Sequence, residues 1–64
     1  MKLKATGDVN HREGAGTSYK VIQVIPKGTT VEWLGYSFVG SLEWKLVKYN
    51  GKLGFASARY LKEV

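Results

Sequence analysis

Histidine, serine and carboxylate side chains are the residues of this chain that could perform acid–base or nucleophilic chemistry. The chain has a single histidine, His11, and five carboxylates, and its serines lie at positions 18, 37, 41 and 57. A catalytic triad needs a nucleophile, a histidine and a carboxylate within hydrogen-bond reach of one another. No spacing in the sequence places a serine beside His11, and no two carboxylates form a defensible acid–base pair. The sequence therefore predicts a protein that is not an enzyme.

Metal and cofactor motifs are also missing from the sequence. There is no cysteine, and the lone His11 has no neighbours with which to build a zinc site. The glycines of "GAGTSY", residues 14–19, are not followed by the third glycine or the Lys-Ser/Thr pair of a phosphate-binding loop. We predict no metal and no cofactor.

Length and composition predict one small globular domain over residues 1–64. The chain is 44% apolar and 23% charged, with a net charge of +5. A chain this short is near the lower limit for a single core without staples. A basic surface favours anionic partners, but the basic residues are spread along the chain and form no stripe, so nucleic-acid binding is a weaker alternative. No apolar run has the length of a membrane span.

Short strands separated by turn signals predict an all-β fold. We expect strands near 7–12, at 21–25 and at 29–35, with a loop at 13–20 and a tight turn at Pro26-Lys27-Gly28. A longer loop is expected at 36–42, then a hairpin, and a short turn around 57–61.

Asn50-Gly51 predicts the hairpin, because a type I′ turn needs positive φ at both central residues. The register pairs Tyr49 with Lys52 and continues to Trp44 opposite Ser57. Side chains alternate between the two faces of a strand. One face is therefore expected to carry Trp44, Leu46, Lys48, Leu53 and Phe55, and the other Lys45, Val47, Tyr49 and Ala56.

The order of these motifs resembles a known family. "VNHREGAGTSYKVIQVIPKGTTVEWLG", followed by "WKLVKYNGKLGFASARYL", is similar to the bacterial SH3-like (SH3b) domain of cell-wall hydrolases and related envelope proteins. The resemblance covers about residues 5–61. It implies an SH3-like barrel of five to six short antiparallel strands with a short 3-10 turn near the C-terminus. It also implies a non-catalytic module that binds peptidoglycan peptide, in an extracellular or cell-envelope location.

The resemblance carries a set of ligand-binding residues onto this chain. Trp44 and Tyr60 would stack on or cover the ligand, and Asn10 and Arg12 would hydrogen-bond peptide carbonyls and carboxylates. A tyrosine in such a barrel could instead be a structural residue with a satisfied hydroxyl. The implied set is Asn10, Arg12, Tyr19, Trp44, Tyr49 and Tyr60.

Some residues depart from the family pattern. Alternation from Val9 points His11 inward, where it is either a hydrogen-bonded interior histidine or a ligand-contacting or pH-sensitive group. A large Trp33 with a small Ala56 indicates a repacked core. The 36–42 connection is longer and more apolar than usual, and either caps the barrel or meets a partner.

Leucines at 46 and 53 make the outer hairpin face apolar, which favours an interaction site unless the 36–42 loop folds over it, with Phe38 or Leu42 as the lid, or the barrel twist carries part of it inside. The second hypothesis is therefore a protein-interaction or self-associating, dimeric module, natural or engineered on this scaffold. Its interface would be Tyr36, Phe38, Leu42, Trp44, Leu46, Leu53 and Phe55.

Overall fold

A computed structural model describes residues 1–64, which form seven strands and one helical turn. That turn, η1, has three residues, so the structure holds no helix that could cross a membrane. The predicted all-β class and the closing 3-10 turn are confirmed, with seven strands where five to six were expected. The elements are β1 (Lys2–Ala5), β2 (Val9–Arg12), β3 (Val21–Ile25), β4 (Thr30–Val39), β5 (Glu43–Tyr49), β6 (Lys52–Ser57), η1 (Ala58–Tyr60) and β7 (Leu61–Glu63).

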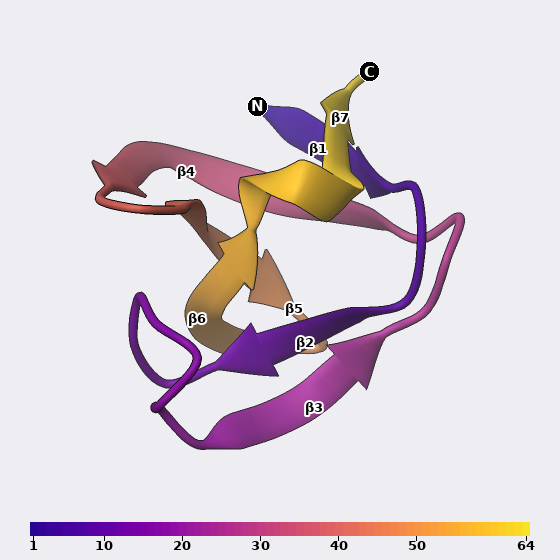
Figure 1. Ribbon diagram of the computed structural model, residues 1–64. Coiled ribbons are helices and arrows are strands. Elements are labelled where there is room, and N and C mark those ends of the chain that lie inside the picture. The colour runs from indigo at the N-terminus through magenta and orange to yellow at the C-terminus, as the bar shows by residue number, and fades with distance from the viewer.

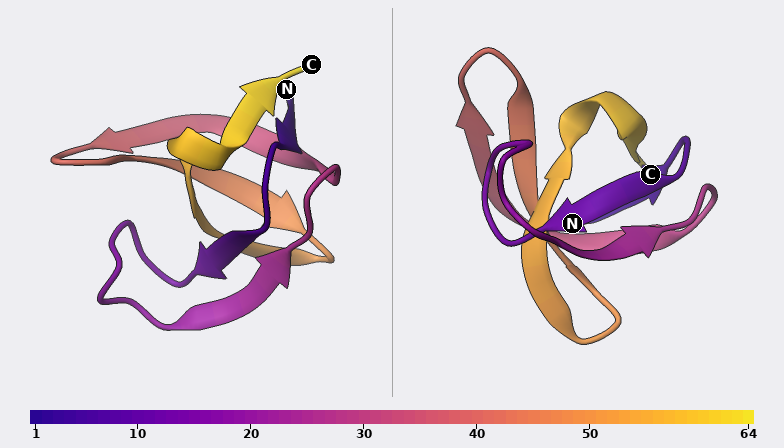
Figure 2. Two further views of the ribbon diagram at one scale, coloured as in Figure 1. Left: turned by 45° about the vertical axis from the view of Figure 1, so that its right-hand side comes forward. Right: turned by 60° about the horizontal axis from the view of Figure 1, so that its bottom comes forward.

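All seven strands belong to one antiparallel sheet that curls around the core. Their order is β3-β2-β6-β5-β4-β1-β7. Strand β7 pairs with β1, so the two chain termini lie side by side (Figure 1). The β4–β5 hairpin projects beyond the rest of the barrel (Figure 2).

The core is made by the inward side chains of six strands. Trp33, Tyr49 and Leu61 pack around its rim, half-buried. The buried cluster is Leu3, Ala5, Val9, Ile25, Val31, Val47 and Ala56. Val47 and Ala56 come from the face of the β5–β6 hairpin predicted to be opposite Trp44, so the sheet buries that face.

The Asn50-Gly51 hairpin has the predicted register. Tyr49 pairs with Lys52, Leu46 with Phe55, and Trp44 with Ser57. Asn50 has φ of 55° and Gly51 has φ of 77°, both in the left-handed region that a type I′ turn requires. The turn alone thus fixes which side chains share a face.

The prediction of a loop at 36–42 is wrong for residues 36–39, which are part of a strand. Strand β4 continues to Val39, and Ser37, Phe38 and Val39 pair with Lys45, Trp44 and Glu43. Its register with β5 shifts between Trp33 and Ser37, where Gly35 has φ of 88°. Such a bulge bends the strand without ending its pairing. Gly35 was interpreted as the end of a strand, but here it marks the bend.

Three short strands also differ from the sequence expectation. Strand β1 was not predicted, although "KLKA" alternates exposed lysines with the buried Leu3 and Ala5. Strand β7 replaces the end of the expected 57–61 turn. The expected strand at 7–12 begins only at Val9. These short strands have three or four residues each, too few for periodicity to identify them.

His11 lies inward, as predicted, and is fully buried. Its Nε2 lies 3.1 Å from the Val47 carbonyl oxygen, and its Nδ1 lies 3.0 Å from the Gln23 amide nitrogen. A carbonyl only accepts, so Nε2 carries the proton and Nδ1 accepts from Gln23. The Gln23 amide also donates to the Tyr49 carbonyl at 2.9 Å. This is the interior, hydrogen-bonded histidine; a side chain with no exposed surface cannot touch a ligand.

Candidate functional site

A groove opens between β2, the 13–20 loop, the tip of the β4–β5 hairpin and η1. Its volume is about 190 Å³. A larger, shallower hollow of about 400 Å³ adjoins it and shares Thr17, Leu42 and Trp44 with it. The groove is lined by Val9, Asn10, Arg12, Thr17, Leu42, Trp44, Ser57, Arg59 and Tyr60.

Trp44 forms the shared wall of the groove and the hollow. It is only 6% exposed, although the hairpin register places it on the outer face. Its indole Nε1 has no hydrogen-bond partner within the chain, and the structure holds no buried side-chain nitrogen or oxygen that lacks one. The Nε1–H therefore keeps contact with solvent and is free to donate to a ligand.

Arg12 holds the loop that forms one side of the groove. Its Nη1 donates to the carbonyl oxygens of Thr17 at 3.0 Å and Tyr19 at 2.9 Å. The Tyr19 ring lies against Gly14, where any added Cβ would overlap it. These contacts fix the path of the 13–20 loop, so the guanidinium that was expected to bind ligand already makes two bonds within the chain.

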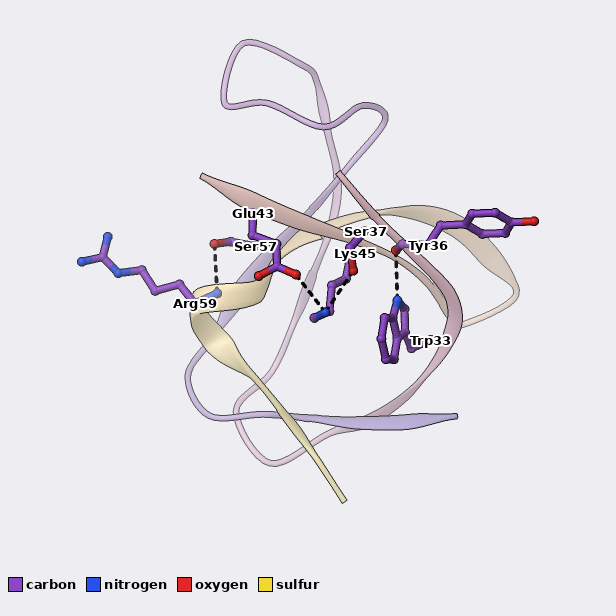
Figure 3. Close-up of polar contacts among 7 residues, drawn as sticks. All are labelled: Trp33, Tyr36, Ser37, Glu43, Lys45, Ser57 and Arg59. Atoms are coloured by element: carbon purple, nitrogen blue, oxygen red, sulfur yellow. Dashed lines mark hydrogen bonds and ion pairs between the residues drawn. The ribbon is translucent and has the colours of Figure 1, made fainter. Parts of the chain in front are cut away.

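The 3-10 turn η1 supplies the opposite side. Ser57 caps it, and its Oγ accepts from the Arg59 backbone nitrogen at 3.4 Å. The Arg59 guanidinium makes no hydrogen bond or ion pair and points away from the other side chains drawn in Figure 3. Tyr60 is 41% exposed beside it. Sequence reasoning missed Arg59; its position directly before the predicted Tyr60 was the available signal.

The structure brings together four of the six predicted ligand-binding residues. Asn10, Arg12, Trp44 and Tyr60 all line the groove. Tyr19 lies beside it and contributes its carbonyl to Arg12. Tyr49 lies elsewhere: it packs against the core, and its carbonyl accepts from Gln23.

The groove contains no carboxylate. The chain's single ion pair joins Lys45 to Glu43 at 3.1 Å on the β4–β5 hairpin, where the Lys45 Nζ also lies 4.0 Å from the centre of the Trp33 ring (Figure 3). Asp8 accepts a hydrogen bond from the Lys27 backbone nitrogen at 2.8 Å. The lining is therefore rich in donors and carries positive charge.

The predicted interface residues lie mainly on the outer side of the β4–β5–β6 hairpins. Phe38 packs edge-on against Phe55, with ring centres 5.1 Å apart. Leu46 and Phe55 are half-buried, whereas Leu53 is 56% exposed. Trp44 is set apart from these residues by its burial. Tyr36 is exposed, and its ring points outward (Figure 3). Leu42 is also exposed and lines the groove.

A curled antiparallel sheet closed by a 3-10 turn, with an aromatic groove beside that turn, defines a small β-barrel of the SH3-like class. The chain belongs to the bacterial SH3 domain family, whose family model matches residues 7–62. Domains of this family are modules generally used for binding. No curated protein matches the chain in sequence.

Proposed function

We propose that this domain is a non-catalytic module that binds peptides of the bacterial cell wall in the groove, at the cell envelope. The observation that carries the proposal is the convergence of Asn10, Arg12, Trp44 and Tyr60 on one groove. These residues come from β2, β5 and η1, and only the folded barrel brings them together.

The groove has the surface that an extended peptide needs. Tyr60 and the edge of Trp44 offer aromatic surface against which a peptide can pack. The Asn10 amide and the Trp44 Nε1–H can donate to its backbone carbonyls. The Arg12 bonds keep the loop wall in place before ligand arrives, so little ordering cost is left for binding.

Co-sedimentation with purified peptidoglycan tests this function. Tyr60→Ala and Asn10→Ala remove exposed groove side chains, and we expect both to lower the bound fraction. Lys52→Ala is the control, because Lys52 lies at the far end of the β5–β6 hairpin, outside the groove. It also shows how far the net positive charge of the domain alone contributes to the bound fraction. Wild-type protein that stays in the supernatant, or groove variants that sediment as well as the wild type, would refute wall binding through the groove.

A second candidate function is self-association through the outer hairpin face. Phe38, Leu46, Leu53 and Phe55 lie together on the outer hairpin face, where Phe38 packs against Phe55 and Leu53 is exposed. This face adjoins the longest uncharged stretch of the chain, between Glu32 and Glu43. Two copies that each carry +5 would repel least where this stretch meets its twin.

Light scattering over a range of concentrations tests self-association. We expect a dimer that Leu46→Lys/Leu53→Thr converts into a folded monomer, because a charge in the middle of an apolar interface is not tolerated. Val24→Thr alters an exposed apolar residue on the edge strand β3 and serves as the control. A wild-type protein that is monomeric at every concentration would exclude this function.

A further inference from the structure

The groove contains one positively charged group that the fold does not use. Arg12 gives Nη1 to the carbonyls of Thr17 and Tyr19. The Arg59 guanidinium makes no hydrogen bond or ion pair. Its backbone belongs to the η1 turn, which Ser57 caps. A guanidinium presents its donors in a planar fork that matches a carboxylate.

No acidic side chain of the chain pairs with Arg59. Asp8 accepts from the Lys27 nitrogen, and Glu43 pairs with Lys45. None of the five carboxylates lines the groove. The partner of this cation must therefore come from outside the chain or from solvent.

We propose that Arg59 binds a carboxylate of the peptide ligand, and that the Trp44 Nε1–H and the Tyr60 hydroxyl are further donors of the same groove. This inference rests on the proposed peptide-binding function and names the chemical group that the groove selects. A single uncommitted guanidinium balances a single negative charge. Phosphate recognition generally uses clusters of basic side chains, whereas the groove's other arginine, Arg12, already donates to two loop carbonyls.

Calorimetric titration with soluble wall peptides tests the assignment. One half of a peptide pool released enzymatically from purified peptidoglycan keeps its carboxylates, and the other half has them capped as methylamides. We expect the wild type to bind the capped pool about tenfold more weakly or worse, as the loss of a charge-assisted hydrogen bond implies. We expect Arg59→Ala to bind both pools equally weakly.

Two further variants separate the effect of the planar guanidinium fork of Arg59 from the effect of the net charge of the protein. Lys52→Ala removes the same charge as Arg59→Ala at a remote site, and we expect it to keep the preference for the uncapped pool. Arg59→Lys keeps the charge but loses the fork, and we expect an intermediate preference. An HSQC spectrum of each variant verifies that it is folded. We expect the fold to be retained, because the exposed side chain of Arg59 does not stabilise it.

The possible outcomes separate this inference from the function on which it rests. Equal binding of both pools by the wild type would overturn the carboxylate assignment and leave peptide binding in place. Binding of neither pool would overturn both. Inorganic phosphate that displaces the uncapped pool better than acetate does would overturn the choice of carboxylate.

Two competitors then locate the carboxylate in the ligand. Acetyl-Ala-Ala-Ala with a free C-terminus carries only a terminal carboxylate, and acetyl-Ala-Glu-Ala amide carries only a side-chain one. Displacement by either peptide from the wild type, but not from Arg59→Ala, supports the proposal and identifies the source.

Discussion

Strand β2 presents polar side chains to both sides of the sheet, and the two sides use them differently. Inward, His11 is fully buried and both ring nitrogens have partners, Val47 and Gln23. Outward, Asn10 is exposed in the groove, and its side chain makes no hydrogen bond within the chain.

This difference separates residues that hold the fold from residues that are free to bind. A buried polar group costs free energy unless it is paired, so the fold must satisfy His11. An exposed amide or guanidinium is satisfied by water and can exchange water for ligand. Substitutions on the inner side should therefore change stability, and substitutions on the outer side should change binding.

Replacing His11 with alanine is expected to have the largest effect. It removes a buried ring and its hydrogen bonds to the Val47 carbonyl and Gln23, so we expect a loss of about 4 kcal/mol in the free energy of unfolding. A domain of this size rarely has more than about 3–5 kcal/mol in total. Thermal unfolding followed by circular dichroism should show little folded protein. The neighbouring Asn10→Ala is the control; an equal loss there would erase the contrast between the two sides.

Gly54→Ala tests how closely β6 packs over the same histidine. A Cβ at Gly54 would lie 2.8 Å from His11 Nε2 and 2.7 Å from the Arg12 carbonyl oxygen. The second contact is with backbone and cannot rotate away, so we expect a loss of about 3 kcal/mol from overpacking. Urea unfolding measures it. Gly40→Ala, where a Cβ meets nothing within 4 Å, is the matched control.

Gln23→Leu tests the hydrogen bonds alone, since leucine has a similar size. It leaves His11 Nδ1 without a donor and removes the Gln23 hydrogen bond to the Tyr49 carbonyl, and we expect a loss of about 2 kcal/mol. Nitrogen-15 NMR of the wild-type imidazole should show the Nε2–H tautomer. The Nδ1–H tautomer would contradict the network as assigned.

The fold was predictable where local chemistry determines it. Asn50-Gly51 demands a type I′ turn, and this turn set the whole register of the central hairpin. Alternation from Val9 placed His11 inward. Gly35 could not be interpreted from sequence, because a glycine with positive φ can end a strand or bend it, and only the pairing of Ser37 with Lys45 decides which.

The site was predictable in part. The family resemblance supplied Asn10, Arg12, Trp44 and Tyr60, which the structure brings together, but it also supplied Tyr49, which packs against the core. The sequence did not reveal that Arg12 donates to loop carbonyls or that Arg59 has no partner. Both facts depend on where the fold places the 13–20 loop and η1. No spacing along the chain contains that information.

Arg12→Ala should cost less stability than the inward substitutions and more than the outward ones, because the side chain lines the groove and also holds the 13–20 loop. Two exposed hydrogen bonds to the loop are lost, and we expect about 1 kcal/mol of destabilisation. Amide exchange in residues 13–20 should accelerate while the β5–β6 hairpin stays protected. Unchanged exchange in the loop would show that Arg12 does not restrain it.

Arg59→Ala is expected to have the smallest effect on stability. Its exposed guanidinium makes no hydrogen bond or ion pair in the chain, so the change in the free energy of unfolding should stay within about 0.5 kcal/mol. Equilibrium unfolding in urea is the measurement, with Lys52→Ala as the charge-matched reference. A stability loss well beyond that of Lys52→Ala would mean that Arg59 supports the η1 turn itself. Weaker peptide binding by Arg59→Ala would then follow from a distorted groove. The carboxylate contact would rest on the preference of the wild type for uncapped peptides and on the reduced preference of Arg59→Lys.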